Sequence, residues 1–246
     1  PDGHNNLGNI LFNNGFNNQA IESFLKAMKL DPDNSKFHSN YLYAILHNAA
    51  LSREAVYHEH LRYGQKYNNP KGIFKKHKGR AIENKKIKIG FVSADYRKHS
   101  VTKHLLPILN GFNKNKFEFF AYSNSFIKDN DTKLISSYFS RWKDICNLND
   151  FDLALTIWED EIDILIDLSG HTKGNRLVAF SYKPAPIQIS LVGYPATTGL
   201  SSIDYVIFDE YFAPKITEKF FVEKILRVPN RFQFYVDNIE NENIKK

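Results

Sequence analysis

The sequence predicts an α/β protein in which a Rossmann-like parallel sheet follows a segment of α-helices. Three apolar runs, 87–92, 162–168 and 187–192, each end in a loop of small, polar or histidine residues. Continuous Val, Ile and Leu runs are typical of parallel strands buried on both faces. From about residue 85 such runs alternate with helical patterns, which favours right-handed βαβ crossovers. Because ligands of open α/β sheets bind at the carboxyl ends of the strands, the three loops predict one site.

The first residues have the spacing of one tetratricopeptide repeat, carried by Leu7, Gly8, Ala20, Phe24, Ala27 and Pro32. The small Gly8 and Ala20 would let two helices cross closely, and an apolar stripe follows on the second helix at Ile21, Phe24, Leu25 and Met28. A second, degenerate helical pair is expected from about 35 to 66. Because such repeats are stable only when stacked, we expect either a truncated array or a small helical cap on the next domain.

A basic segment follows the predicted helices. Eight Lys or Arg residues and one acidic residue lie between 71 and 88, whereas the formal net charge of the whole chain is +6. Its Pro and Gly residues and its weak apolar periodicity indicate a solvated linker over 69–86. A strip that contacts phosphates or an acidic partner is the alternative. The segment lacks the aromatic interleaving that base stacking uses, so we expect no nucleic-acid partner.

The α/β part is expected to contain seven strands and four helices. The strands are predicted at 87–93, 117–122, 142–146, 162–168, 187–192, 205–208 and 224–228. The helices are predicted at 101–110, 131–139, 150–159 and 176–182.

Several common binding motifs are absent from the sequence. No Gly-x-Gly-x-x-Gly follows the first strand, so the dinucleotide-binding fingerprint is absent, and no Walker phosphate loop occurs. The histidines lack zinc-ligand spacing and Cys146 is the only thiol, so we expect no metal and no cofactor. No apolar run approaches the roughly 20 residues that cross a bilayer. We therefore expect a cytoplasmic protein without a membrane partner, and the start at Pro1 suggests that its natural beginning is missing.

Four motifs, in this order and after the repeats, resemble glycosyltransferase family 41, the O-linked N-acetylglucosamine transferases with their SPINDLY-type members. They are Ile89 to Asp95 with His99-Ser100-Val101, Asp163 to Thr172, Pro184 to Gln188, and Gly193-Tyr194-Pro195 with Thr197-Thr198-Gly199. The likeness runs from Pro1 to about Pro229, and Ala196 stands where the family usually has Gly. It implies the amino-terminal catalytic lobe of a GT-B glycosyltransferase, with the carboxyl-terminal lobe absent from this chain.

The resemblance also implies roles for particular residues. It assigns catalysis to His99, and substrate binding to Asp95, His171, Thr172, Lys173, Gly193, Tyr194, Pro195 and Thr197. Asp95 would orient the His99 imidazole, or it would close the turn by bonding backbone amides. His171, Thr172 and Lys173 would face the cleft between the lobes, or His171 would simply tie its loop down. Gly193, Tyr194 and Pro195 would pack beside the sugar, although loop geometry alone explains them about as well.

The expected function is that of an inverting protein O-glycosyltransferase that moves a sugar, N-acetylglucosamine from UDP-GlcNAc, to Ser or Thr of proteins recruited by the repeats. The donor is a substrate and needs no metal. One alternative is a repeat-bearing interaction module with an inactive α/β remnant. Another is a related transferase for O-fucose or Asn-linked glucose. We expect this chain alone to be inactive without the other lobe.

The expected domain organisation has four parts. Residues 1–68 hold the tetratricopeptide repeat and its degenerate partner, and 69–86 form the basic linker. Residues 87–230 form the Rossmann-like catalytic lobe, and 231–246 begin a linker towards the absent lobe.

Overall fold

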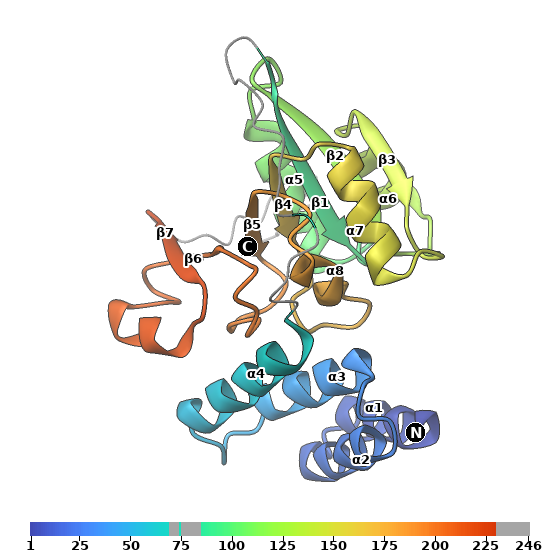
Figure 1. Ribbon diagram of the computed structural model, residues 1–246, viewed down its shortest axis with the longest axis vertical. Coiled ribbons are helices and arrows are strands. Elements are labelled where there is room, and N and C mark those ends of the chain that lie inside the picture. The colour runs from blue at the N-terminus through green and yellow to red at the C-terminus, as the bar shows by residue number, and fades with distance from the viewer. Residues whose placement is uncertain (69–73, 75–84, 230–246) are drawn as a thin grey trace, which may run out of the picture.

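The computed structural model describes residues 1–68, 74 and 85–229 of the chain. Most of the predicted basic linker and the whole predicted linker after residue 230 lie outside the described residues. Figure 1 shows a layer of helices at one end of the molecule and a twisted sheet flanked by helices at the other. No described helix is long and apolar enough to cross a membrane.

The helical unit, residues 1–68, consists of two antiparallel helix pairs. They are α1 (Asp2–Asn13), α2 (Asn17–Leu30), α3 (Ser35–Leu46) and α4 (Arg53–Tyr67). Gly8 is buried against the Phe24 ring, and a Cβ at this position would lie 2.6 Å from it. The side chains of Asn34 and Ser52 cap α3 and α4 by accepting from backbone N–H groups. Within the predicted apolar stripe of α2, Phe24 is buried, whereas Leu25 is 45% exposed.

The α/β lobe, residues 87–228, is built on a seven-stranded sheet with every neighbouring pair parallel. Its strands are β1 (Ile87–Ser93), β2 (Phe117–Ser123), β3 (Arg141–Asp144), β4 (Ile164–Asp167), β5 (Ile187–Leu191), β6 (Tyr205–Asp209) and β7 (Lys224–Val228). Their order in space is β3-β2-β1-β4-β5-β6-β7. The structure therefore confirms the predicted Rossmann-like sheet preceded by helices.

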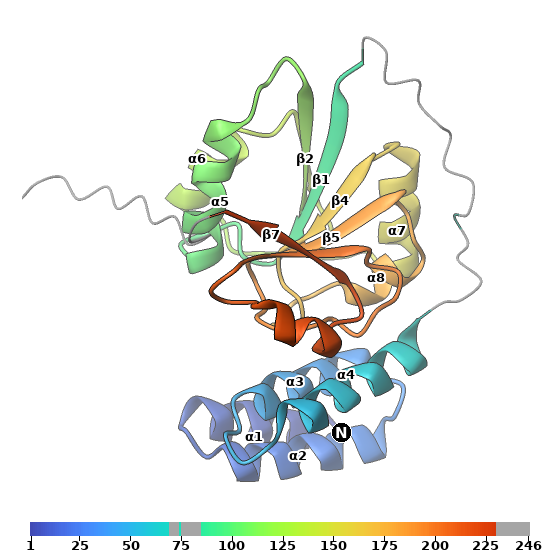
Figure 2. The same cartoon turned by 90° about the vertical axis from the view of Figure 1, so that its left-hand side faces the viewer.

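Helices cover both faces of the sheet, as Figure 2 shows. They are α5 (Ser100–Gly111) and α6 (Asn130–Ser136) on one face, and α7 (Asp150–Glu159) and α8 (Leu177–Ser181) on the other. Ile89 and Phe91 of β1 pack in the cluster that includes α5, whereas Val92 packs in the cluster that includes α7. This alternation follows from the two-residue period of a strand, and it explains why a strand covered on both faces is apolar throughout.

The helical unit is docked on the carboxyl edge of the sheet (Figure 2). One hydrophobic cluster contains Leu42, Ile45 and Tyr63 from the helices together with Leu200 and Ile203 from the lobe. The short 3-10 helix η1 (Lys215–Phe220) also meets α4, through the rings of Tyr57 and Phe220 at 6.1 Å. We call this shared contact the junction. It matters for function because it covers part of the edge at which ligands of such sheets bind.

Candidate active site at the carboxyl edge of the sheet

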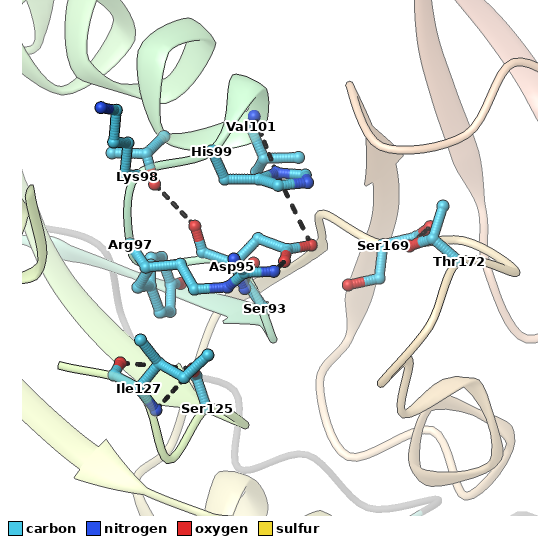
Figure 3. Close-up of polar contacts among 12 residues, drawn as sticks. Ser93, Asp95, Arg97, Lys98, His99, Val101, Ser125, Ile127, Ser169 and Thr172 are labelled. Carbon is cyan, nitrogen blue, oxygen red and sulfur yellow. Dashed lines mark hydrogen bonds and ion pairs between the residues drawn. The ribbon is translucent and has the colours of Figure 1, made fainter. Parts of the chain in front are cut away.

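The direction of the winding changes between β1 and β4. The chain runs from β1 to β2 and β3 on one side, and from β4 to β7 on the other. Such a switch point is where open α/β sheets bind their ligands. The β1 loop (94–99) and the β4 loop (168–176) meet there, and Figure 3 shows Asp95 and His99 across from Ser169 and Thr172. The structure thus places Asp95 and His99 on one side of the switch point and Thr172 on the other.

His99 caps a helix and still offers a ring nitrogen. Its Nδ1 accepts a hydrogen bond from the Val101 N–H at 3.3 Å, at the amino terminus of α5, and lies 3.8 Å from Asp95 Oδ2. Because Nδ1 accepts, the neutral ring carries its proton on Nε2. The side chain is 36% exposed, and no hydrogen bond from the described residues reaches Nε2. A ligand at the switch point can therefore contact this atom.

The Asp95 carboxylate faces the side chains of Arg97 and His99. Its Oδ1 accepts from Arg97 Nη2 at 3.1 Å, and its Oδ2 is the atom nearest to His99. The turn itself is closed by other groups: the Asp95 N–H donates to Ser93 Oγ at 2.9 Å, and Thr102 Oγ1 donates to the Asp95 carbonyl at 2.6 Å. The backbone of the turn is thus held by Ser93 and Thr102, and the carboxylate lies beside the Arg97 and His99 side chains.

The β4 loop is folded on itself. The Thr172 hydroxyl donates to the Ser169 carbonyl at 2.8 Å, and Lys173 is exposed beside it. Gly174 has φ +80°, and a Cβ there would lie 2.7 Å from that of Ala94, so the β4 loop closely approaches the β1 loop. Thr172 and Lys173 consequently lie near the surface on the β1 side of the loop.

Asp167 anchors this loop from the end of β4. Its carboxylate accepts from the N–H groups of Ser169 and Gly170 at 3.1 and 2.8 Å, and from Ser190 Oγ at 3.0 Å. Burial raises the pKa of Asp167 to about 6, and the three hydrogen bonds pull in the opposite direction. The carboxylate therefore ties the β4 loop to strand β5.

His171 points away from the switch point and into the helical unit. It is 0% exposed, with Nε2 2.9 Å from the Thr198 carbonyl and Nδ1 3.0 Å from Ser39 Oγ of α3. Since a carbonyl can only accept, Nε2 carries the proton and the Ser39 hydroxyl donates to Nδ1. The Tyr63 ring packs edge-on at 4.5 Å. Both nitrogens are engaged, which is the loop-tying arrangement, the second of the two considered for this residue.

In the β5 loop, residues 192–199, the residues predicted to contact the sugar lie partly in the protein interior and partly at the surface. A Cβ on Gly193 would lie 1.9 Å from the Leu168 carbonyl oxygen, so the close approach of the two loops requires glycine. Tyr194 is buried, with its hydroxyl 2.7 Å from His60 Nε2 of α4. Pro195 is exposed. Among these three residues, Pro195 alone presents an exposed side chain to solvent.

Thr197 is buried at the far end of the β5 loop. Its hydroxyl donates to Glu223 Oε2 at 2.5 Å and accepts from the N–H groups of Gly199 and Val222. The neighbouring Thr198 bonds the other carboxylate oxygen through its hydroxyl and its N–H. Burial raises the pKa of Glu223, against the pull of these hydrogen bonds. Thr197 is thereby placed in a structural clamp, away from Asp95 and His99.

Three histidines are buried at the junction: His38, His60 and His171. Burial lowers the pKa of His38 and of His60 to about 4, and it lowers the pKa of His171 well below its ordinary value. The rings of His60 and His171 lie 5.3 Å apart, so charging both would add repulsion to the cost of burial. At neutral pH all three are therefore uncharged.

Sequence reasoning missed the partners of these loop residues, namely Ser39, His60, Gly64 and Glu223. One signal was present: His60 occupies an apolar stripe of a predicted helix, between Val56 and Gly64. A histidine at such a position needs a partner once it is buried. Nothing in the spacing, however, says which loop supplies that partner.

A pocket of about 380 Å³ opens beside the β5 loop. The turn between α3 and α4, residues 195–197 and η1 enclose it, and aromatic side chains dominate the η1 side. Its walls include Arg53, Tyr57, Pro195, Phe212 and Phe220. Residues of both the helical unit and the lobe therefore line this pocket.

Taken together, these observations define a Rossmann-like lobe whose carboxyl edge is docked on tetratricopeptide-type helices. The family model of Glycosyl transferase family 41 matches residues 21–241, and the tetratricopeptide repeat model matches residues 1–34. The chain therefore belongs to glycosyltransferase family 41, the family of protein O-GlcNAc transferases.

Individual relatives agree with this assignment. The chain is 29% identical over 219 residues to the probable UDP-N-acetylglucosamine--peptide N-acetylglucosaminyltransferase SPINDLY of Oryza sativa subsp. japonica, which covers 87% of this chain and 24% of that protein. It is 33% identical over 161 residues to the SEC enzyme of Arabidopsis thaliana, covering 65% and 16%. An O-GlcNAc transferase mutant of Thermobaculum terrenum matches with a TM-score of 0.85 and 30% identity, over 92% of this chain and 43% of that one. The chain thus spans about a quarter of the length of its SPINDLY relatives.

Proposed function

We propose that this chain forms the acceptor-side lobe of a protein O-glycosyltransferase that transfers N-acetylglucosamine from UDP-GlcNAc to Ser or Thr with inversion. Membership of family 41 and the names of the relatives support the reaction class. One observation carries the assignment of the site: His99, beside Asp95, leaves Nε2 open at the switch point, whereas the histidine of the next loop is locked. The proposed compartment is the cytoplasm, where a lone thiol such as Cys146 stays reduced.

The reaction needs a place for one proton. As the acceptor oxygen bonds the anomeric carbon and the bond to the diphosphate breaks, the hydroxyl proton must leave. His99 Nε2 would take it once the ring proton sits on Nδ1. That proton would then face Asp95 Oδ2 in place of the Val101 N–H, and the carboxylate would hold the ring in this tautomer. Stabilising the departing diphosphate is left to groups outside this pair.

The helical unit would supply the acceptor surface. The pocket beside the β5 loop joins helix and lobe residues, and its aromatic walls, Tyr57 and Phe220 among them, suit an apolar side chain of a protein segment. An acceptor that lies across this pocket reaches the same edge of the sheet that carries His99.

A donor panel tests the proposal. A model acceptor protein would be incubated with UDP-GlcNAc, GDP-fucose or UDP-glucose and with the longest protein that contains these residues, and the product would be analysed by mass spectrometry. Addition of one N-acetylhexosamine on Ser or Thr is expected. A different sugar would reassign the donor, and no transfer from any donor would favour the interaction-module alternative. Robust transfer by the 246-residue chain alone would contradict the division between two lobes.

A further inference from the structure

The β5 loop is a strained segment that its surroundings hold in place. Val192, its first residue, has φ +69°, a left-handed conformation that β-branched residues rarely adopt. Such a conformation persists only when neighbouring contacts over-determine it. On the side of the lobe, the contacts include the approach of Gly193 to the Leu168 carbonyl, the packing of Gly170 against Tyr194, and the clamp of Thr198 on Glu223.

The helical unit supplies further contacts. His60 Nδ1 lies 2.7 Å from the Val56 carbonyl in the same helix, so Nδ1 carries the proton and Nε2 is an acceptor. The Tyr194 hydroxyl, 2.7 Å away, therefore donates to His60 Nε2. One turn later, a Cβ on Gly64 would lie 1.8 Å from the Gly199 carbonyl oxygen. Helix α4 thus contacts the loop near both of its ends.

The buried and exposed parts of the loop are adjacent in sequence. Tyr194 is 2% exposed and faces the helix, whereas Pro195 is exposed and lines the pocket at the carboxyl edge. Moving the tyrosine would move the proline with it, because they share one peptide unit. His60 also borders this pocket, although it is itself 0% exposed.

We propose that His60 of the helical unit is a positioning residue for the α/β lobe: through its hydrogen bond to Tyr194 it sets where the β5 loop stands at the carboxyl edge. The repeats would then do more than bind acceptors, because they would complete the geometry of the catalytic lobe. The effect on catalysis rests on the proposed transferase function, whereas the effect on the loop does not.

The first experiment measures the loop directly in the 246-residue chain. Amide hydrogen exchange of peptides that cover 192–199 would be compared between the unsubstituted chain, His60→Ala and His60→Gln. The glutamine keeps an acceptor oxygen near the place of Nε2. The matched control is His58→Ala, an exposed histidine of the same helix. We expect exchange in His60→Ala to be faster by about tenfold or more, with β1 unchanged, a partial return in His60→Gln and no change in the control.

A more conservative variant is needed in case His60→Ala destabilises the whole chain. Tyr194→Phe keeps the ring and removes only the donor, so it should release the loop without opening a cavity. If His60 acts through Tyr194, the double variant should exchange no faster than the quicker of the two single variants. Equal exchange of 192–199 in Tyr194→Phe and in the His58→Ala control would overturn the proposal, as would fully additive single effects.

The second experiment measures catalysis in the longest protein that contains this chain. With saturating donor, His60→Ala should lower kcat by about tenfold or more and change the acceptor KM by less than about twofold, because a displaced loop misplaces the reacting groups. A rise in acceptor KM alone would overturn the positioning role. If no variant and no unsubstituted protein transfers sugar, the proposed function fails, while the exchange result still decides whether His60 holds the loop.

Discussion

His99 and His171 follow two neighbouring parallel strands at the same edge of the sheet, yet they occupy opposite environments. His99 is 36% exposed and has one engaged ring nitrogen, whereas His171 is fully buried and has two. The difference comes from the helical unit, which covers the edge at β4 and β5 and leaves the loop after β1 open. A histidine after a parallel strand is therefore available for chemistry only where no second unit docks on it.

The largest expected effect is a loss of transfer activity in His99 variants. Two substitutions distinguish a catalytic role of His99 from a role in capping α5. His99→Ala should lower transfer by about 10²- to 10⁴-fold and cost about 1 kcal/mol of unfolding free energy through the lost cap. His99→Asn is the matched variant, because asparagine is a good N-cap and cannot take the proton. It should keep the stability and lose the activity. Wild-type turnover by His99→Asn would mean that the histidine only caps α5.

Acid should lower the free energy of unfolding through the buried histidines of the junction. The pKa of His38 and of His60 is lowered to about 4, so their contribution to stability is complete above the unfolded pKa of about 6.5. It is lost as the pH falls towards 4, on the order of 3 kcal/mol for each histidine. Asp167, whose pKa is raised to about 6, works in the opposite direction and reduces the net loss.

Urea unfolding at pH 7.5, 5.5 and 4.5 measures this slope. The free energy of unfolding should fall with each step into acid, and His60→Gln should show a shallower fall because one titrating group is gone. An equal fall in the unsubstituted chain and in His60→Gln would show that His60 is not held neutral.

The next largest expected effect is on stability, and it comes from the close backbone contact between Gly64 and Gly199 at the junction. Gly64→Ala places a Cβ 1.8 Å from the Gly199 carbonyl oxygen, and we expect it to lower the unfolding free energy by about 3 kcal/mol. Gly3→Ala is the control, because a Cβ there meets nothing within 4 Å and alanine favours a helix by roughly 0.5 to 1 kcal/mol. Similar changes in the two variants would contradict the close docking of α4 on the β5 loop.

The smallest expected effect concerns the pocket. Tyr57→Ala removes an aromatic wall, and it should raise the acceptor KM about three- to tenfold, consistent with the loss of about 1 kcal/mol of contact. The donor KM serves as the internal control and should not change. A change in the donor KM alone would assign the pocket to the nucleotide sugar.

The sequence was most informative about the strands and helices. β1 was expected at 87–93 and α7 at 150–159, and both have these bounds. Buried parallel strands are continuous apolar runs, and the loops between them contain polar residues, so their limits are visible. The 3-10 helix η1 was not expected, because six residues without apolar periodicity leave no signal.

Side-chain direction in the loops could not be predicted in the same way. All three loops were assigned to one edge, and they lie there. Which residues face a ligand, however, depends on helices that are distant in sequence: His60 and Tyr194 are 134 residues apart, and Ser39 and His171 are 132 apart. Local patterns carry no information about such partners. For Tyr194 and His171, the sequence therefore could not decide between a contact with the ligand and a role in holding the loop.

Histidine reactivity in the native chain tests the contrast between the two regions most directly. Diethyl pyrocarbonate acylates accessible neutral imidazoles, and mass spectrometry of peptides from the 246-residue chain at pH 7 reports each histidine separately, with exposed His58 as the reference. We predict that His99 reacts at a rate comparable to His58, and that His60 and His171 react only after the chain is unfolded. Reaction of His171 at the rate of His99 in the folded chain would contradict the account.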